Sequence, residues 1–213
     1  MKTDELIAML ASGASPVESG VTARRFRTAL GWGVPGAILL MVIVLGVRPD
    51  LAEAARLPMF WMKLGFPLLV AALALVMAQR LARPGMRLGR LPMLLATVLL
   101  ALWAAGAFTV AEAPPSQRSE LIFGESWASC PFNIALLSIP LFIGVMWAMK
   151  GLAPTRLALA GGAAGLLAGA VSATVYALHC PEMQIPFIGI WYVLGMLIPT
   201  VAGFLAGKRL LRW

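Results

Sequence analysis

The sequence predicts an all-α polytopic membrane protein in which six transmembrane helices form three hairpins. Three observations lead to this prediction: six long apolar stretches, a composition that is 61% hydrophobic and 12% charged, and a one-sided distribution of lysine and arginine. A hydrocarbon core ~30 Å thick needs roughly 20 apolar residues in a helix. The six stretches are Ala29–Val47, Pro58–Met77, Leu91–Val110, Phe132–Met149, Leu157–Leu178 and Ile185–Ala206.

The distribution of charge predicts the orientation of these spans. Thirteen of the 17 lysines and arginines fall on the side of the N-terminus, whereas only Arg48, Arg56 and Arg118 fall on the opposite side. Cytoplasmic loops of membrane proteins carry an excess of lysine and arginine. We therefore expect both termini in the cytoplasm, and we interpret the net charge of +8 as a topology signal and not as a surface for direct nucleic-acid binding.

The chain divides into three parts by composition. Residues 1–28 form a cytoplasmic N-terminal segment, residues 29–207 the transmembrane domain, and residues 208–213 a basic cytoplasmic tail. The N-terminal segment lacks a continuous apolar region, so we expect no cleavable signal peptide and assign insertion to the first span. No loop is long enough to bury a core of its own, so function must come from the helices and short segments.

The N-terminal segment contains a pattern typical of a short helix. Thr3 can cap it, and Asp4 and Glu5 in the first turn favour the positive end of the helix dipole. An isolated helix of this length is marginal in water, so it becomes stable only when docked on the bilayer, the bundle or a partner; a frayed terminus is the alternative. Its apolar residues are Leu6, Ile7, Met9 and Leu10.

Two features stand out within the spans. Gly161, Gly165 and Gly169 place small residues at intervals of four on the fifth span, which predicts close helix packing within the bundle; homodimerisation is the alternative. Lys63 lies inside the second span, near its outer end, and we expect its side chain to snorkel to the outer surface. No Asp or Glu lies in any span, so the sequence does not favour an ion pathway.

The two cysteines, Cys130 and Cys180, both lie at the outer ends of spans, and each is followed by proline. The outer side of a bacterial inner membrane is the oxidising periplasm, where disulfides are permitted. Three interpretations remain open at this point: a permanent disulfide that ties two hairpins together, a reduced pair that senses oxidant or metal, or a thiol oxidoreductase pair. The absence of a CxxC motif disfavours the last of these.

A metal site is a further interpretation of the same region. Cys130, Cys180 and His179 could supply soft ligands to a thiophilic metal ion, with Glu182 as a fourth. His179 could equally cap the fifth helix, whose end favours a positive charge. The chain contains no paired carboxylates, no nucleophile with a base and no glycine-rich phosphate loop, so we do not expect an enzyme.

Several motifs together resemble the NrsF family of integral-membrane anti-sigma factors, the negative regulators of extracytoplasmic-function sigma factors. They are the opening Met1–Ala11, the run Arg24-Arg25-Phe26, six spans of this length, and the sequences Ser129-Cys130-Pro131 and His179-Cys180-Pro181. The HxxxCxxC motif of the zinc-binding anti-sigma factors is absent from the sequence.

The resemblance implies a multi-pass protein of the bacterial inner membrane that holds such a sigma factor inactive. It also implies that Cys130 and Cys180 sense metal or oxidative stress and release the partner. We assign the sigma-factor-binding surface to Asp4, Leu6, Ile7, Met9 and Leu10, by topology as much as by resemblance. A small membrane transporter or a thiol-redox membrane enzyme is the alternative function.

Overall fold

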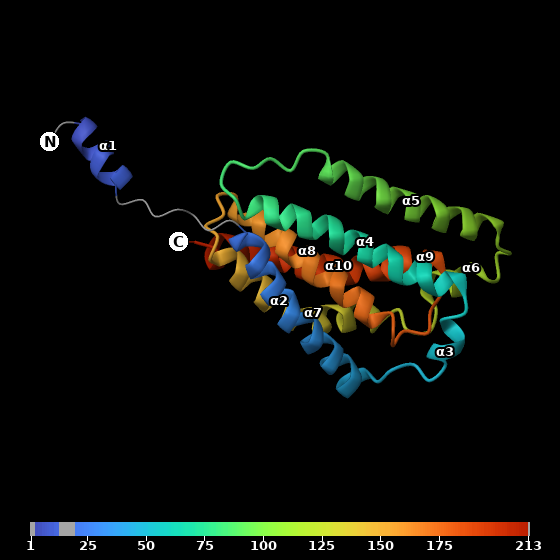
Figure 1. Ribbon diagram of the computed structural model, residues 1–213. Helices are drawn as coiled ribbons and strands as arrows, with labels where there is room; N and C mark the ends of the chain where they lie inside the picture. The colour runs from blue at the N-terminus through green and yellow to red at the C-terminus, as the bar shows by residue number, and fades with distance from the viewer. Residues whose placement is uncertain (1–2, 13–19, 213) are drawn as a thin grey trace.

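The computed structural model describes residues 3–12 and 20–212, and every regular element in these ranges is helical (Figure 1). Six helices are long and apolar enough to cross a membrane, which confirms the prediction of an all-α, six-span protein. The elements are α1 (Thr3–Ser12), α2 (Val21–Leu40) with the π-helical turn η1 (Met41–Leu45), α3 (Leu51–Ala54), α4 (Pro58–Leu81), α5 (Leu91–Glu112), α6 (Arg118–Phe123), α7 (Cys130–Lys150), α8 (Leu157–Tyr176), α9 (Ile185–Phe187), the π-helical turn η2 (Ile188–Tyr192) and α10 (Val193–Leu210).

The helix boundaries follow from local sequence signals. Proline stands in the first turn of α4, α5, α7 and α9, where its missing N–H would have no helical partner anyway. The first span begins at Val21, eight residues before the apolar stretch, because a helix continues beyond the hydrocarbon as long as its polar residues allow. Gly46, with φ +79°, ends the first span after η1.

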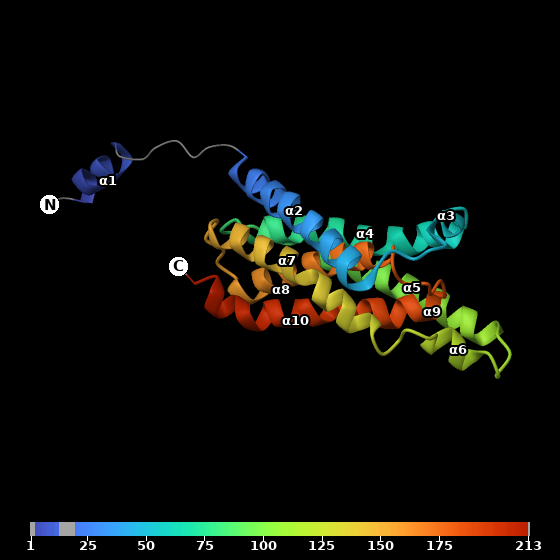
Figure 2. The same cartoon turned by 90° about the horizontal axis from the view of Figure 1, so that it is seen from below.

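The order of the spans along the chain matches the order in which they pack only in the second half of the bundle. The most extensive contacts join α8 to α10, α8 to α4, α2 to α7, and α7 to α8, whereas consecutive α2 and α4 barely touch. Figures 1 and 2 show α8 inside the bundle with α4, α7 and α10 around it. The bundle is therefore built around α8, with extensive contacts between the consecutive spans α8 and α10 and few between the consecutive spans α2 and α4.

The glycines of α8 lie in the seam with α10. A Cβ atom added to Gly161 would collide with the carbonyl oxygen of Gly203, and one added to Gly165 would collide with that of Pro199. At Gly169 the added atom would lie 2.9 Å from the Cα atom of Met196. The small residues that the sequence places at intervals of four thus let two helix backbones of one chain approach each other.

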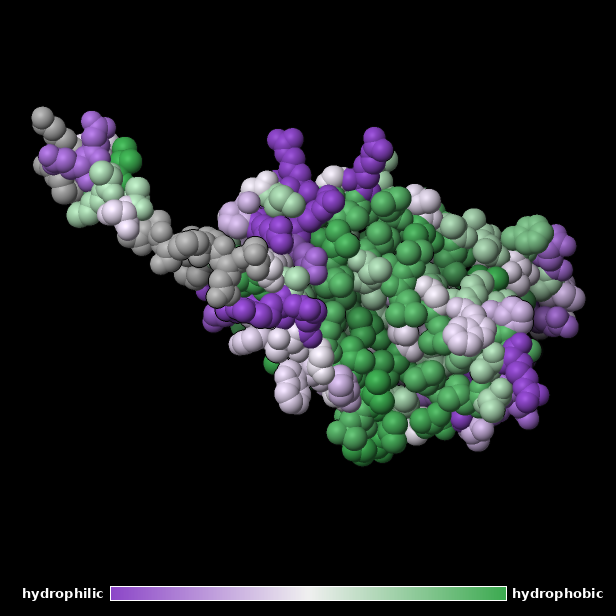
Figure 3. Space-filling view, in the orientation of Figure 1, coloured by the Kyte–Doolittle hydropathy of each residue, from purple (hydrophilic) through white to green (hydrophobic). Residues whose placement is uncertain are grey.

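The surface of the bundle is divided into an apolar belt and two polar ends. Figure 3 shows hydrophobic side chains across the middle of this face and hydrophilic ones gathered at both ends. We call the end with loops 46–57, 113–129 and 177–184 the cysteine end, and the end with residues 82–90, 151–156 and 208–212 the basic end. An apolar belt between two polar ends is the surface expected of a protein that spans a bilayer.

Candidate functional site

Both cysteines lie at the cysteine end and are completely buried. Cys130 is the first residue of α7, and Cys180 belongs to the segment that joins α8 to α9. Each has 0% exposed surface, and each is a free thiol in the structure. The two side chains lie within electrostatic range of one another, so the fold brings the predicted pair into one buried cluster.

Two tyrosines complete the surroundings of the thiols. Tyr176 of α8 and Tyr192 of η2 have ring centroids 5.8 Å apart, and both lie within electrostatic range of Cys130 and Cys180. The hydroxyl of Tyr192 is buried and has no hydrogen-bond partner in the described structure. Tyr192 belongs to a π-helical turn, and single π-turns within α-helices are frequent at functional sites.

Lys63 of α4 reaches the same cluster from the opposite side. Its Nζ atom donates to the carbonyl oxygens of Cys180 and Glu182, each at 2.6 Å, and lies 5.5 Å from the ring centroid of Tyr192. The side chain has 0% exposed surface, so the prediction that it snorkels to the outer surface is wrong. The physical reason is that the loop between α8 and α9 folds back over the end of α4 and supplies acceptors inside the protein.

A second cation binds the same loop from the linker after the first span. Arg48 donates from Nε and Nη2 to the two carboxylate oxygens of Asp50, at 2.7 and 2.6 Å, and from Nη1 to the carbonyl oxygen of Cys180 at 3.2 Å. The hydrogen bond to Asp50 raises the pKa of the Arg48 guanidinium, and the same bond lowers the pKa of the Asp50 carboxyl. Both groups therefore stay charged at neutral pH.

Further bonds tie this linker to the segment that carries Cys180. The backbone N–H of Arg48 donates to the carbonyl oxygen of Leu178 at 3.2 Å. The Nδ1 atom of His179 lies 2.8 Å from the carbonyl oxygen of Gly46, and its ring packs on Tyr176 with centroids 5.6 Å apart. The end of the first span and the Cys180 segment are thus held together by backbone and side-chain contacts.

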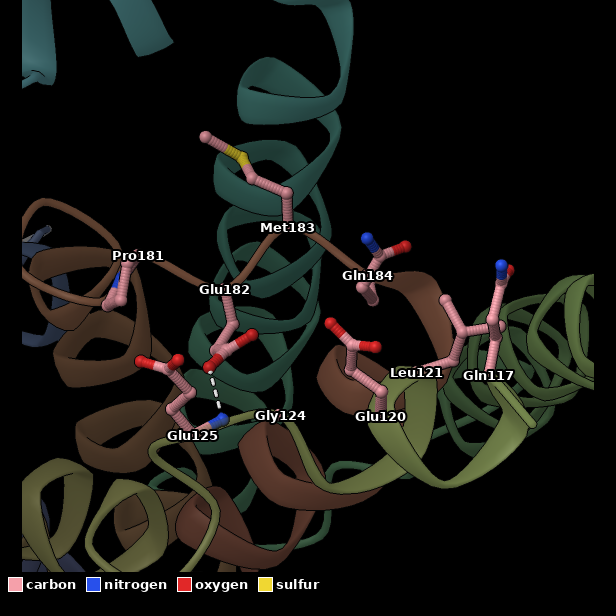
Figure 4. Close-up of a pocket in the computed structure, with 9 residues that line it drawn as sticks. All are labelled: Gln117, Glu120, Leu121, Gly124, Glu125, Pro181, Glu182, Met183 and Gln184. Atoms are coloured by element: carbon pink, nitrogen blue, oxygen red, sulfur yellow. Dashed lines mark hydrogen bonds between the residues drawn. The ribbon is translucent and has the colours of Figure 1, made fainter.

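The four candidate metal ligands are not all brought together. His179 faces Gly46, while Glu182 turns toward the loop after α6 and accepts a hydrogen bond from the backbone N–H of Glu125 at 2.8 Å (Figure 4). Within residues 3–12 and 20–212, no group of three His, Cys, Asp or Glu side chains could hold a metal ion. The described fold therefore places only Cys130 and Cys180 in the interior of the site.

A cavity of about 640 Å³ adjoins the buried cluster. Its wall includes Pro181 and Glu182, which directly follow Cys180, together with Glu120 of α6 and Glu125 of the loop after α6. Figure 4 shows these carboxylates converging from α6, its following loop and the Cys180 segment. The cavity is thus lined by glutamates, and its lining begins at Pro181, the residue that follows the buried Cys180.

The predicted partner-binding residues lie far from this site, on α1. Figure 1 shows this helix standing apart from the six-helix bundle beside its basic end. All of its residues are exposed, and its apolar side chains Ile7, Met9 and Leu10 are 59%, 59% and 65% exposed. Asp4 and Leu6 are likewise exposed, so the five candidate residues share a helix that has no buried residue.

Sequence reasoning found the cysteines but missed four of their neighbours. Arg48, Tyr176 and Tyr192 carry no local motif, and they meet the cysteines only through contacts between distant segments. Lys63 did carry a signal, because an ionisable residue inside a span is a functional candidate by default, but its partner could not be named from the sequence.

The fold and the site define a class: a six-span membrane protein with a buried thiol pair and an exposed apolar helix at its N-terminus. The chain belongs to the NrsF family, described as negative regulator of sigma F, which matches residues 10–213. This family consists of regulators and not of enzymes, so the resemblance drawn from the sequence motifs is confirmed and the redox-enzyme alternative falls away.

Two relatives match over their full lengths. The probable anti-sigma-F factor NrsF of Azospira oryzae is 55% identical over 213 residues, which cover 100% of both chains. The anti-sigma-F factor NrsF of Caulobacter vibrioides is 40% identical over 214 residues, again covering 100% of both chains. No solved structure matches the chain.

Proposed function

We propose that this protein is an anti-sigma factor of the bacterial inner membrane that sequesters an extracytoplasmic-function sigma factor through α1. It releases this partner when Cys130 and Cys180 react with an oxidant or bind a thiophilic metal ion. The observation that carries the proposal is the combination of two free, fully buried thiols at the cysteine end with an exposed helix beside the basic end that carries apolar side chains. The two full-length relatives are both named anti-sigma-F factors, which supports a sigma factor as the partner.

The proposed orientation follows from the charges at the two ends. Arg83, Arg87 and Arg90 lie in one loop of the basic end, and Lys150 and Arg156 flank another. Lys208 and Arg209 lie in the last turn of α10, and Arg212 follows that helix. The positive-inside rule places this end in the cytoplasm, where a sigma factor would be met. The cysteine end then faces the periplasm, where thiols encounter oxidants.

The first span offers a route between the two ends. Cys130 begins α7, which packs along α2: a Cβ atom added to Gly36 would lie 3.1 Å from Pro140, and one added to Gly144 would lie 3.2 Å from the carbonyl oxygen of Ala29. The carbonyl oxygen of Cys180 accepts a hydrogen bond from Arg48, which lies just after the C-terminal end of the first span. A bond formed between the two sulfurs would therefore act on α2 from both α7 and the Cys180 segment.

The energies are compatible with such a switch. Moving a two-state population from mostly held to mostly free requires roughly 5 kcal/mol of differential stabilisation. A disulfide typically contributes about 2–4 kcal/mol, and a metal bound by thiolates contributes on the same scale or more. One event at the thiol pair can thus supply most of the free energy needed to release the partner.

The docking surface is tested by two matched double variants of α1. Leu6→Asp with Leu10→Asp places charge on the apolar face, whereas Ala8→Asp with Ser12→Asp adds the same charge at the same spacing on the opposite face. We expect the first variant to lose sigma-factor co-purification from detergent extracts and to give constitutive target expression, while the second retains repression. Equal repression by both variants would overturn the assignment to α1.

The thiol pair is tested by Cys130→Ser and Cys180→Ser, with target expression and membrane abundance measured together. A sensing pair predicts normal abundance and loss of the response to oxidant and to metal. A permanent disulfide predicts reduced abundance, because the unfolded chain is no longer constrained. Loss of the response to only one of the two stimuli would identify the chemistry that the pair detects.

A further inference from the structure

A second cavity, of about 530 Å³, lies between α5 and the start of the last span. Figures 1 and 2 show α5 on the outside of the bundle, with α6 and α9 beside one of its ends. The wall on α5 runs from Leu102 to Ala111, which is about 14 Å of helix, and Arg118 and Ile122 of α6 close one end. We call this cavity the α5 groove, and its facing wall consists of Ile185, Pro186, Gly189 and Ile190.

Hydrogen bonds fix the walls of the α5 groove relative to one another. The Nε1 atom of Trp103 in α5 donates to the carbonyl oxygen of Gly189 in η2 at 2.8 Å. The Nε1 atom of Trp191 in η2 donates to the carbonyl oxygen of Ile122 in α6, also at 2.8 Å. The three elements around the groove are thus bonded to one another, so the hollow belongs to the folded chain.

The lining of the α5 groove is apolar except at one end, where Arg118 is the one charged residue among the described residues that line it. Arg118 donates from Nε to the carbonyl oxygen of Ala113 at 3.0 Å and from Nη2 to that of Ala111 at 3.3 Å. No carboxylate of residues 3–12 or 20–212 forms an ion pair with it. Because a guanidinium group has five N–H donors, Arg118 keeps donors for an anion.

The α5 groove opens on the apolar surroundings of the bundle. The span that forms its wall is the least buried of the six, and Ala107 and Ala111 in the lining are exposed. The lining begins in the middle of α5 and ends beyond its last turn, where Arg118 lies at the cysteine end. An apolar channel at hydrocarbon depth with a cation at the polar surface has the layout of a phospholipid, whose acyl chain lies in the bilayer core below its phosphate.

We propose that the α5 groove binds an anionic phospholipid of the leaflet at the cysteine end, with one acyl chain along α5 and the phosphate on Arg118. Arginine recognises phosphate through charge-assisted N–H···O bonds. Lipid tails are as apolar as the lining, so contacts with the chain do not by themselves distinguish one lipid from another. The charge of Arg118 therefore supplies the preference for an anionic headgroup. This inference is independent of the proposed function.

A second copy of the chain fits the α5 groove less well than a lipid does. The apolar stretches of the six spans contain no aspartate or glutamate, so a span of another copy would bring no carboxylate to Arg118. An anionic phospholipid provides both the apolar chain and the negative charge.

The headgroup is tested by native mass spectrometry of the delipidated full-length protein. Equal amounts of phosphatidylglycerol and phosphatidylethanolamine with the same acyl chains are added. We expect one phosphatidylglycerol per chain, bound about fivefold more strongly than phosphatidylethanolamine, because one arginine beside an anionic lipid gives a preference of this order. Arg118→Gln should abolish the preference and Arg118→Lys should keep most of it. Arg56→Gln is the matched control, since it removes an exposed arginine at the same end but outside the groove.

The acyl chain is tested by filling the α5 groove. Ala107→Phe places a ring in the lining, whereas Ala105→Phe adds the same ring to the opposite face of α5. Both positions are exposed, so neither variant disturbs a buried contact. We expect Ala107→Phe to lose most of the bound phosphatidylglycerol and Ala105→Phe to keep it.

Each contrary outcome overturns a stated part of the inference. Equal binding of the two lipids by the wild-type protein, or an unchanged preference in Arg118→Gln, would overturn the role of Arg118. Unchanged occupancy in Ala107→Phe would overturn the placement of the chain. A lipid-free dimer that Ala107→Phe dissociates and Ala105→Phe does not would assign the groove to a second copy instead. Should Arg118→Gln fail to fold, the wild-type preference and the two phenylalanine variants decide.

Discussion

The fifth span, α8, and the third, α5, are both apolar helices of similar length, but they occupy opposite positions in the structure. They contain 20 and 22 residues, with peak mean hydropathies of 1.6 and 2.1. In the structure, 67% of the most apolar window of α8 is buried inside the protein, against 11% for α5. The more hydrophobic helix is therefore the more exposed one.

The difference shows that side-chain size, and not hydrophobicity, selects the centre of a membrane bundle. Lipid tails are as apolar as leucine, so hydrophobic side chains gain little by leaving them for the protein interior. The glycines of α8 admit the backbone of α10, whereas α5 presents large side chains such as Met93 and Phe108, which are 71% and 68% exposed.

The largest effect is expected from filling the seam of α8. Gly165→Val places side-chain atoms where the carbonyl oxygen of Pro199 lies, and neither backbone can move without disturbing the whole seam. We expect a loss of about 3 kcal/mol or more in unfolding free energy, and reduced abundance in the membrane. Gly65→Val is the control, because nothing lies within 4 Å of a Cβ atom there; equal thermal stability of the two variants in detergent would contradict the central role of α8.

A smaller effect is expected where the loop after α6 meets the segment after α8. Gly124 has φ +53°, and a Cβ atom added there would lie 2.5 Å from the carboxyl carbon of Glu182. Gly124→Ala should therefore cost more than Gly85→Ala, which has φ +77° but open space around it. We expect a difference of about 1 kcal/mol in unfolding free energy, because the added Cβ atom displaces the Glu182 carboxylate from its hydrogen bond with the backbone N–H of Glu125.

The attachment of α5 should depend on a few contacts near one end. The Nε1 atom of Trp103 donates to the carbonyl oxygen of Gly189 at 2.8 Å, and a Cβ atom added to Gly106 would lie 3.4 Å from the Cα atom of Pro186. Trp103→Phe removes the hydrogen bond and should cost about 1 kcal/mol. Hydrogen exchange should accelerate in residues 185–192 and in the half of α5 at the cysteine end, whereas Trp32→Phe, at a side chain that is 80% exposed, should change neither.

The smallest effect concerns the ion pair that ties the end of the first span to the segment after α8. Arg48 holds the pKa of Asp50 below its usual range, so the pair contributes stability above the unfolded-state pKa of about 3.9 and loses it as the pH falls through the folded-state pKa. Wild type and Asp50→Asn should therefore differ in thermal stability at pH 7 and converge toward pH 3. A constant difference over that range would show that the carboxylate charge contributes nothing.

Much of the fold was predictable because its signals are local. Span length, hydropathy and charge placed all six helices, and the residues from Thr3 to Ser12 form the expected short helix. The glycine spacing indicated close packing but could not name α10 as the partner. The packing order was not predictable, because α2 pairs with α7 through close contacts between residues more than a hundred positions apart.

The site was predictable only in part. Counting spans placed Cys130 and Cys180 at the same end, because an even number of crossings between two loops returns the chain to one side. The cations and tyrosines around them depend on how the α8–α9 loop folds back over α4, and no periodicity encodes that path. The π-helical turns η1 and η2 are likewise products of tertiary packing, since their sequences are as apolar as the α-helical ones.

The seam between α8 and α10 also has a consequence for biosynthesis. The ribosome delivers α10 after the other five spans, so the glycine groove of α8 faces lipid until the last helix inserts. Cys130 enters the membrane fifty residues ahead of Cys180, and Tyr192, which helps to enclose both, arrives later still. A nascent chain thus exposes its two thiols one after the other, and both are enclosed only when the last span has packed against the others. We therefore expect the thiols to be most open to oxidation, and the chain to proteases, before this last step of insertion.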